Sequence, residues 1–222
     1  MGKLYPESHV EIEGVLARHY ELLLNLITLG RYSSFIEDAI GSMAIGPTDK
    51  ILDLGAGTGY NETYMSQYLD GKGEIVGLDK SEDAIARFRR RFEDDGNVKV
   101  KSARIDQPLP YEAHFDKVLT SFVVHGLPHP NREKVIENAY RALKPRGKFF
   151  LLDYGEFEVS ELPAYVRLPF KVAECKYAFD YISRDWEEIL REFGFEITQR
   201  SEYFDGFARL LEATKRREDG GG

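Results

Sequence analysis

The chain lacks the features that mark disulfide scaffolds, membrane proteins and metalloproteins. Its 222 residues include one cysteine, Cys175, so no internal disulfide can form, and we expect a reducing, cytoplasmic environment. The longest apolar run, at 22–29, is interrupted by Asn25 and Thr28 and is too short to span a bilayer. No signal peptide opens the sequence, and no spacing of histidines, cysteines and carboxylates suggests a metal site.

Positive charge is also scarce. The 38 aspartates and glutamates outnumber the 30 lysines and arginines, and the net charge of −8 argues against sequence-independent binding of nucleic acid. The arginines at 87–91 fall on a predicted helix and are expected to face solvent. A hydrophobic share of 42% and a charged share of 31% are typical of a globular domain, and the length suits one domain with an added helical cap.

Two common nucleotide-binding patterns are incomplete in the glycine-rich stretch at 51–59. The dinucleotide fingerprint G-x-G-x-x-G would need a third glycine where Tyr60 stands, and the NTPase phosphate loop would need a Gly-Lys-Ser/Thr tripeptide, which the chain does not contain. The stretch does contain an acid followed by three alternating glycines: Asp53, Gly55, Gly57 and Gly59. Because glycine has no Cβ, backbone N–H groups there can approach a ligand closely, and we predict a nucleotide-like cofactor.

Short apolar segments alternate with helical ones along the chain. Strands are expected at 50–54, 74–79, 97–101, 115–122, 148–153, 196–201 and 207–214. Helices are expected at 61–69, after an N-cap at Ser81, at 131–143 with Asn131 as cap, and at 183–193 before Gly194. The alternation predicts a Rossmann-like, doubly wound α/β fold. The last two strands form a hairpin that places one antiparallel strand in a mostly parallel, seven-stranded sheet.

Ligands of open α/β sheets lie beyond the carboxyl ends of the strands. Asp53, the glycine turn, Asp79 and His125 all fall at such ends. Asp79 follows Gly55 by 24 residues (79 − 55), close to the offset of roughly 20 expected for an acid that binds both ribose hydroxyls. The alternative is that Asp79 only caps a helix or stabilises a turn.

The acid and its glycines resemble the first motif of the class I S-adenosylmethionine (SAM) methyltransferases. Two more segments extend the resemblance: 115–125 is similar to the family's fourth-strand motif, and 141–148 looks like its LKPGG segment. Arg146 replaces a glycine of that segment, which we interpret as a position that tolerates a side chain. The resemblance covers nearly the whole chain and implies SAM as cofactor. It implies cofactor contacts from Tyr20, Asp53, Gly55, Ala56, Gly57, Gly59, Asp79, Lys80, Ile105, Asp106 and Ser121.

A narrower resemblance concerns the two ends of the chain. Residues 17–30 and 186–195 look like the corresponding parts of the ubiquinone/menaquinone C-methyltransferases, although many related small-molecule methyltransferases share these patterns. The resemblance implies that Tyr20 closes the cofactor pocket, whereas ordinary amphipathic packing is the alternative. We therefore expect residues 1–45 to form a helical cap, 46–215 the SAM-binding domain with a lid-like insertion near 155–182, and 216–222 a flexible tail.

Two segments depart from the family pattern. The family's acid near the adenine aligns with Ile105, and Asp106 stands one place later, so either position could face the adenine. Where the family has two adjacent histidines, this chain keeps only one of them, His125. A histidine at this place can remove a proton from an acceptor, or it can form a pocket wall.

Aromatic residues gather between the fifth strand and the last helix. In the resembled enzymes this insertion covers the methyl acceptor, but such a group is also what a lid needs for its own core. The residues concerned are Tyr165, Phe170, Tyr177, Phe179 and Tyr181.

The sequence thus predicts a SAM-dependent methyltransferase that acts on a small, quinone-like or apolar molecule. An amine, a lipid headgroup or a protein remains an alternative acceptor. An NAD-dependent oxidoreductase and a non-catalytic SAM-binding protein are alternatives of other classes. The segment at 22–29 is compatible with peripheral contact to a membrane or a partner as well as with core packing. The sequence does not define the oligomeric state.

Overall fold

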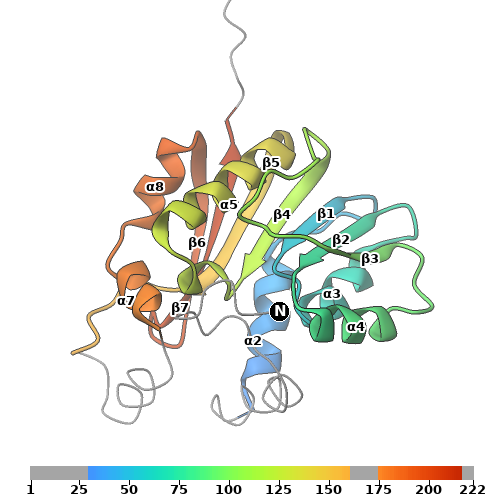
Figure 1. The fold of residues 1–222 in the computed structure, drawn as a ribbon, viewed down its shortest axis with the longest axis horizontal. Helices are drawn as coiled ribbons and strands as arrows, with labels where there is room; N and C mark the ends of the chain where they lie inside the picture. The colour runs from blue at the N-terminus through green and yellow to red at the C-terminus, as the bar shows by residue number, and fades with distance from the viewer. Residues whose placement is uncertain (1–29, 161–174, 217–222) are drawn as a thin grey trace, which may run out of the picture.

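The strands of the protein form one twisted sheet with helices on both faces (Figure 1). The computed structural model describes residues 30–160 and 175–216. The strand order is β3-β2-β1-β4-β5-β7-β6. The strands are β1 (Lys50–Leu54), β2 (Glu74–Asp79), β3 (Val98–Ser102), β4 (Phe115–Ser121), β5 (Leu143–Tyr154), β6 (Phe195–Tyr203) and β7 (Ala208–Lys215).

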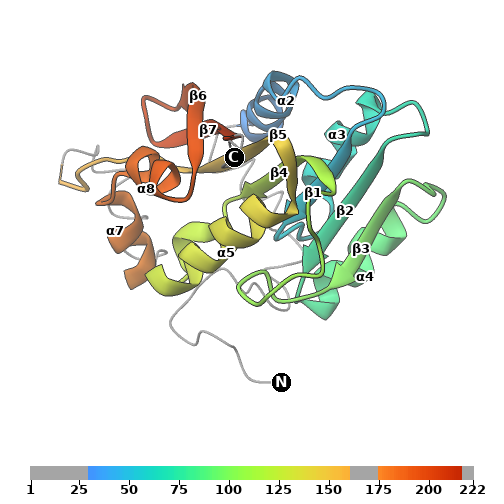
Figure 2. The same ribbon diagram turned by 90° about the horizontal axis from the view of Figure 1, so that it is seen from above.

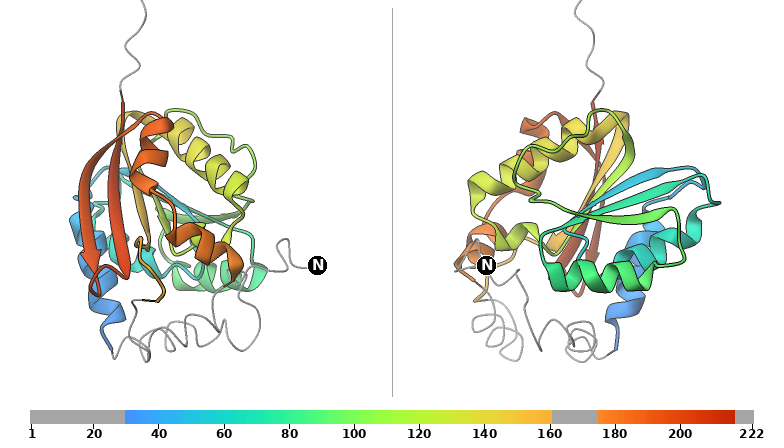
Figure 3. Two further views of the ribbon diagram at one scale, coloured as in Figure 1. Left: turned by 90° about the vertical axis from the view of Figure 1, so that its left-hand side faces the viewer. Right: turned by 45° about the vertical axis from the view of Figure 1, so that its right-hand side comes forward.

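Strands β3, β2, β1, β4 and β5 are parallel, and β7 is antiparallel to both β5 and β6. Figure 3 shows β6 and β7 side by side at one edge of the molecule. Their hairpin turns through Phe204, Asp205 and Gly206, which all have positive φ. The predicted seven-stranded, mostly parallel sheet is thereby confirmed. Strand β7 is antiparallel to β6 because a short hairpin can join only antiparallel neighbours.

The helices begin where local sequence signals favour them. They are α2 (Tyr32–Ser42), α3 (Tyr60–Met65), α4 (Glu82–Arg91), α5 (His129–Ala142), α7 (Lys176–Ile182) and α8 (Trp186–Glu192), with short 3-10 turns η1 (Ser66–Tyr68) and η2 (Val124–Gly126). The predicted cap at Ser81 is confirmed, since its hydroxyl accepts the Ala84 N–H at 3.3 Å.

Three predicted helices differ from the structure. The helix predicted at 61–69 is the six-residue α3 followed by the 3-10 turn η1. Asn131 is not an N-cap: α5 begins two residues earlier, because Pro130 is well suited to a first helical turn. The helix predicted at 183–193 is α8, which begins only at Trp186, while the separate helix α7 precedes it. Asp185 caps α8 by accepting the Glu188 N–H at 2.9 Å, whereas the Ser183 hydroxyl donates back to the Asp180 carbonyl.

Apolar side chains form one cluster on each face of the sheet. Neighbouring residues of a strand point to opposite faces, so Leu151 and Leu211 join the cluster under α5 and α8, while Leu152 and Leu210 join the cluster under α2. Figure 2 shows α2 and α5 on opposite sides of the sheet. The described part of the predicted cap, residues 30–45, packs on the domain through Phe35, which lies in the second cluster.

Candidate active site

Three glycines shape the turn between β1 and α3. Gly55, Gly57 and Gly59 have φ angles of +96°, +56° and +83°, in the region that favours glycine. A Cβ at Gly55 would lie 2.4 Å from Val123, and one at Gly59 would lie 2.7 Å from Phe92. A Cβ at Gly57 would meet nothing within 4 Å. Gly55 and Gly59 are therefore required by internal packing, whereas Gly57 leaves a bare backbone facing open space.

Asp79 ties this turn to the end of β2. Its Oδ2 accepts the Gly57 N–H and its Oδ1 accepts the Ser81 N–H, each at 2.8 Å. The turn role considered for Asp79 is thus present in the structure. Each carboxylate oxygen has a second lone pair, so ribose binding stays a prediction.

Two buried acids lie next to the turn. Asp53 at the end of β1 and Glu62 in α3 are both 0% exposed. Asn61 donates to Asp53 Oδ2 at 3.5 Å, but in the described part of the chain Asp53 Oδ1 and both Glu62 oxygens have no hydrogen-bond donor. Burial is the main cause that raises the pKa of Asp53 to about 7 and the pKa of Glu62 well above its usual value. The Oδ1 atom of Asp53 and the uncovered backbone at Gly57 fit a cationic, nucleotide-like cofactor such as SAM.

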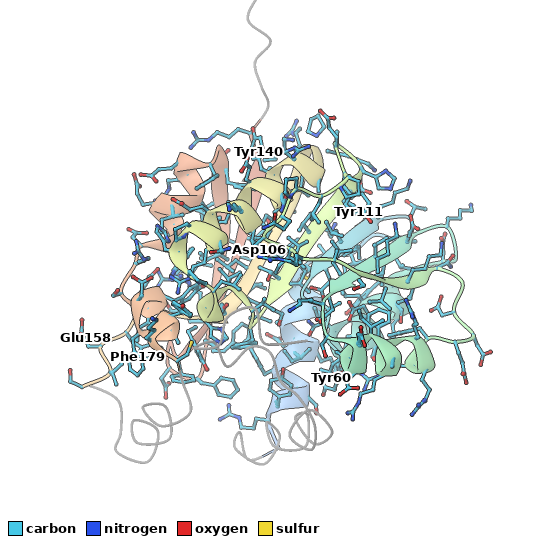
Figure 4. The ribbon with its side chains drawn as sticks, in the orientation of Figure 1. Tyr60, Asp106, Tyr111, Tyr140, Glu158 and Phe179 are labelled. Carbon is cyan, nitrogen blue, oxygen red and sulfur yellow. The ribbon has the colours of Figure 1, made fainter. Side chains whose placement is uncertain are left out.

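Asp106 lies near the centre of the view in Figure 4 and is held on two sides. The Arg104 guanidinium donates to its two oxygens at 3.1 and 2.7 Å, and Asn131 Nδ2 donates to Oδ2 at 2.6 Å. The preceding residue, Ile105, is buried, and its carbonyl accepts a bond from Asn138 at 2.7 Å. Adenine contact by Ile105 or Asp106 stays a prediction.

His125 lies on η2, just beyond the end of β4, and is 7% exposed. Its Nδ1 is 2.6 Å from Asp153 Oδ1, and its backbone N–H donates to Asp153 Oδ2 at 3.1 Å. We infer from this contact that the proton of a neutral ring is on Nδ1, so Nε2 carries the lone pair. The Tyr154 ring packs against the imidazole with centroids 4.7 Å apart. The pair has the composition and orientation of a general base with its orienting carboxylate.

Arg132 of α5 fixes the position of this histidine. Its guanidinium is fully buried and donates to the carbonyls of Val124 and His125 at 3.1 and 3.2 Å. The same group donates to the Tyr177 carbonyl and pairs with Asp180 Oδ2 at 2.6 Å. One side chain therefore joins η2 to α7.

A second buried arginine faces the same side of the sheet. Arg209 of β7 stands opposite Asp153 of β5 and is 2% exposed. Its Nη1 pairs with Glu156 Oε2 at 2.7 Å, while its Nη2 is buried and has no partner among the described residues. Positive charge thus lies close to the histidine–aspartate pair.

The structure brings several predicted positions to one edge of the sheet: Asp53, the glycine turn, Asp79 with Lys80, Ser121 and His125 lie at the carboxyl ends of β1, β2 and β4. Tyr20, Tyr165 and Phe170 fall outside the described residues. Of the other aromatic residues, Tyr181 is 1% exposed and stacks on Trp186 at 4.3 Å, so it belongs to the core. Phe179, labelled on α7 in Figure 4, is partly buried, as is Tyr177.

Sequence reasoning missed several residues of this region, among them Glu62, Arg132, Asp153 and Arg209. Asp153 had a usable signal, because it ends a predicted strand as Asp53 and Asp79 do. The other residues had no comparable signal.

The described residues offer neither a candidate metal site nor a candidate membrane-spanning helix. Within 30–160 and 175–216, no three histidine, cysteine or acidic side chains gather where they could hold a metal ion. Over the same residues, no helix has the length and apolarity to cross a membrane. Cys175 is buried with a free thiol.

Comparison with known proteins finds methyltransferases. Residues 51–147 match the family described as "Methyltransferase domain". The chain is 26% identical over 212 residues to a ubiquinone/menaquinone biosynthesis C-methyltransferase of Methylococcus capsulatus, covering 86% of this chain and 83% of the relative. It is 27% identical over 197 residues to an uncharacterized methyltransferase of Synechocystis, covering 87% and 90%. A solved SAM-dependent methyltransferase from Aquifex aeolicus shares the fold, with a TM-score of 0.60, 19% identity and coverage of 81% and 89%.

Proposed function

We propose that this chain, a class I SAM-dependent methyltransferase, methylates a carbon or oxygen atom of a small, quinol-like aromatic molecule. When bound, SAM supplies a methyl group on a sulfonium, which is already reactive. The protein then has to bind and orient the two reactants and exclude water.

The cofactor is assigned to the edge formed by β1, β2 and the glycine turn. The uncovered backbone at Gly57 allows close approach, and Asp53 and Asp79 supply negative charge. Ala56, Lys80, Ile105, Asp106 and Ser121 complete the proposed contacts. These assignments rest on the position of the residues and on the resemblance of their motifs.

The observation that carries the proposed acceptor chemistry is the contact between His125 and Asp153. A phenolic oxygen or the carbon next to it must lose a proton during methylation, and Nε2 of His125 is the proposed proton acceptor. Asp153 holds the ring in the required tautomer and stabilises the imidazolium that forms. Tyr154, which packs on the imidazole, and the partly buried Tyr177 and Phe179 offer surfaces suited to an aromatic ring.

The relative from Methylococcus capsulatus supports a quinol-like acceptor, since its name describes carbon methylation in quinone biosynthesis. An amine, a lipid headgroup or a protein is the alternative acceptor. A neutral amine has a lone pair ready for attack, so its methylation would not need the His125–Asp153 pair.

The test is transfer of a labelled methyl group from SAM to a panel of hydroquinols, catechols, amines and phospholipids. We expect label in a phenolic compound and loss of about 100-fold or more of the rate in His125→Gln, with SAM affinity retained. Labelling of amines alone, at a rate that His125→Gln does not change, would contradict the proposed chemistry. SAM binding without any labelled product would favour a non-catalytic SAM-binding protein.

A further inference from the structure

Glu62 is a buried acid that the proposed methyl transfer does not use. It lies in α3, directly after the glycine turn, and faces β2. A Cβ added to Gly77 of β2 would lie 3.3 Å from Glu62 Oε1, so the carboxyl group is enclosed between helix and sheet. Within 30–160 and 175–216, neither of its oxygens has a hydrogen-bond donor as partner. An enclosed carboxylate without a donor would be strongly destabilising.

Asp53 can supply the hydrogen-bond partner that the Glu62 carboxyl group otherwise lacks. Both carboxyl groups are fully buried, and a side-chain hydrogen bond between them lowers the pKa of Asp53 and raises the pKa of Glu62. Ionised carboxylates only accept hydrogen bonds, so a bond between Asp53 and Glu62 needs a proton on one of them. Two acids at such close range do not both ionise readily, and they titrate as a pair.

The charged groups around the pair have opposite effects on it. Asp79, at the end of β2, adds negative charge close to Asp53 and favours retention of the proton. Arg91, at the end of α4, is the cation that acts on Glu62, but its side chain is exposed to solvent. From α3, Asn61 contributes a neutral amide, which donates to Asp53 at 3.5 Å. Among the residues that the structure describes, no buried cation therefore acts on the pair.

We propose that Asp53 and Glu62 share one proton in the ligand-free protein and release it to solvent when SAM binds, so that Glu62 links cofactor affinity to pH. The proposal rests on the cofactor site assigned above, which includes Asp53. SAM brings a sulfonium and an ammonium group, and positive charge near Asp53 favours the ionised pair. The O–H bond of the shared proton breaks, and the proton passes to the buffer.

Calorimetry of SAM binding to the full chain tests this linkage. Titrations in two buffers of different ionisation enthalpy give the number of protons released. A range from about pH 5.5 to about pH 7 keeps the ligand's own amino group protonated. We expect release approaching one proton at the lower end of this range. We also expect the Kd for SAM to fall by up to about tenfold per pH unit as pH rises.

The variant Glu62→Gln tests the contribution of Glu62 to proton release. The glutamine amide can donate permanently to Asp53, so Asp53 is ionised before SAM binds. We expect this variant to release no proton and to bind SAM with a Kd that does not depend on pH over the same range. Glu37→Gln removes an exposed acid of α2 and is the matched control, with wild-type release expected.

The possible outcomes separate this inference from the cofactor assignment. SAM binding to the wild type without proton release overturns the inference alone, as does a Glu62→Gln variant that still releases a proton. Failure of the wild type to bind SAM overturns the cofactor assignment together with the inference. If Glu62→Gln does not fold, the proton count of the wild type still decides.

Discussion

Asp153 contacts His125 twice. One carboxylate oxygen lies 2.6 Å from the ring Nδ1, and the other accepts the backbone N–H of the same residue at 3.1 Å. A single acid at the end of β5 therefore sets both the position of the histidine backbone and the tautomer of its ring. This double contact favours the proposed role of His125 as an oriented base over that of a pocket wall.

Replacing Asp153 by asparagine is expected to slow methyl transfer by about 100-fold or more, because an asparagine amide can donate to Nδ1 and stabilise the wrong tautomer. Single-turnover transfer of labelled methyl groups measures the rate, and calorimetry measures SAM affinity, which we expect to stay within about twofold, since the acid does not touch the glycine turn. Asp205→Asn, at an exposed turn position, is the control. An unchanged rate in Asp153→Asn would show that His125 is not an oriented base.

The three glycines of the turn are expected to respond differently to alanine. Gly57→Ala should lower the free energy of unfolding by only about 1 kcal/mol, because its Cβ meets open space and the penalty is the positive φ. Gly55→Ala and Gly59→Ala should lower it by about 2 kcal/mol or more, because each Cβ also clashes with a packed side chain, Val123 or Phe92. Denaturant unfolding measures these values.

The same variants test the cofactor assignment. Gly57→Ala is expected to weaken SAM binding by at least about tenfold, since a methyl group would occupy the space assigned to the ligand. Calorimetric titration of the folded variant measures this change. Equal SAM affinity in wild type and Gly57→Ala would place the cofactor elsewhere.

Arg146 has a φ of +65°, which explains why the resembled family has glycine at this position. The sequence interpretation, that a side chain is tolerated, therefore needs a correction: the side chain is exposed, but the backbone is strained. Arg146→Gly should raise the free energy of unfolding by about 0.5–1 kcal/mol, after allowance for the greater freedom of glycine in the unfolded chain. Arg146→Ala keeps the strain, so thermal unfolding should show little change from wild type.

Arg132 is expected to be among the most sensitive positions of the fold. Arg132→Met should lower the free energy of unfolding by about 3 kcal/mol, because it leaves buried carbonyls without donors. Arg132→Lys should recover little of this loss, since an ammonium cannot reproduce the fork of donors. Arg184→Met removes the other, more exposed partner of Asp180, and should lose less than about 1 kcal/mol in the same denaturant assay.

Ligand-free stability should depend on pH through Glu62. Its pKa is raised by burial, so the folded state holds a proton that the unfolded state has lost above about pH 4.5. The free energy of unfolding therefore falls as pH rises, by at most about 1.4 kcal/mol per pH unit for one proton. Glu62→Gln removes this dependence on pH. The free energy of unfolding of the variant, relative to that of the wild type, should therefore rise between about pH 5 and about pH 7.

His129 acts in the opposite direction, because burial lowers its pKa and its contribution to stability rises with pH. The contribution of His129 is the same in the wild type and in Glu62→Gln, so it cancels in the difference between their free energies of unfolding. Chemical denaturation at several pH values measures that difference. A constant difference across the range would mean that Glu62 holds no extra proton in the folded state.

The sequence predicted β1 and β2 with the observed bounds, because each is an apolar run that ends in an acid and is followed by a turn signal. The order of elements then implied which strand ends would meet. Element ends were harder to predict where two signals compete. At the start of α5, Pro130 prevails over Asn131, and at α8, Asp185 prevails over Ser183.

The polar partners of the site could not be predicted in the same way. His125 and Asp153 are 28 residues apart, and their contact depends on the pairing of β4 with β5. Glu62 lies in a six-residue helix, too short for hydrophobic periodicity to reveal which side is buried. Both contacts arise from tertiary packing, so the sequence does not show which side chains meet, even though Asp153 stands at the end of a predicted strand.

The guanidinium of Arg132 couples two properties that many enzymes can alter separately. It bonds the backbone of His125 and also the first turn of α7, whose aromatic residues are proposed to face the acceptor. A substitution that shifts α7 to admit a larger acceptor would also move the proposed base. New acceptor preferences are therefore easier to reach through side-chain exchanges on α7 than through insertions or deletions that change its position.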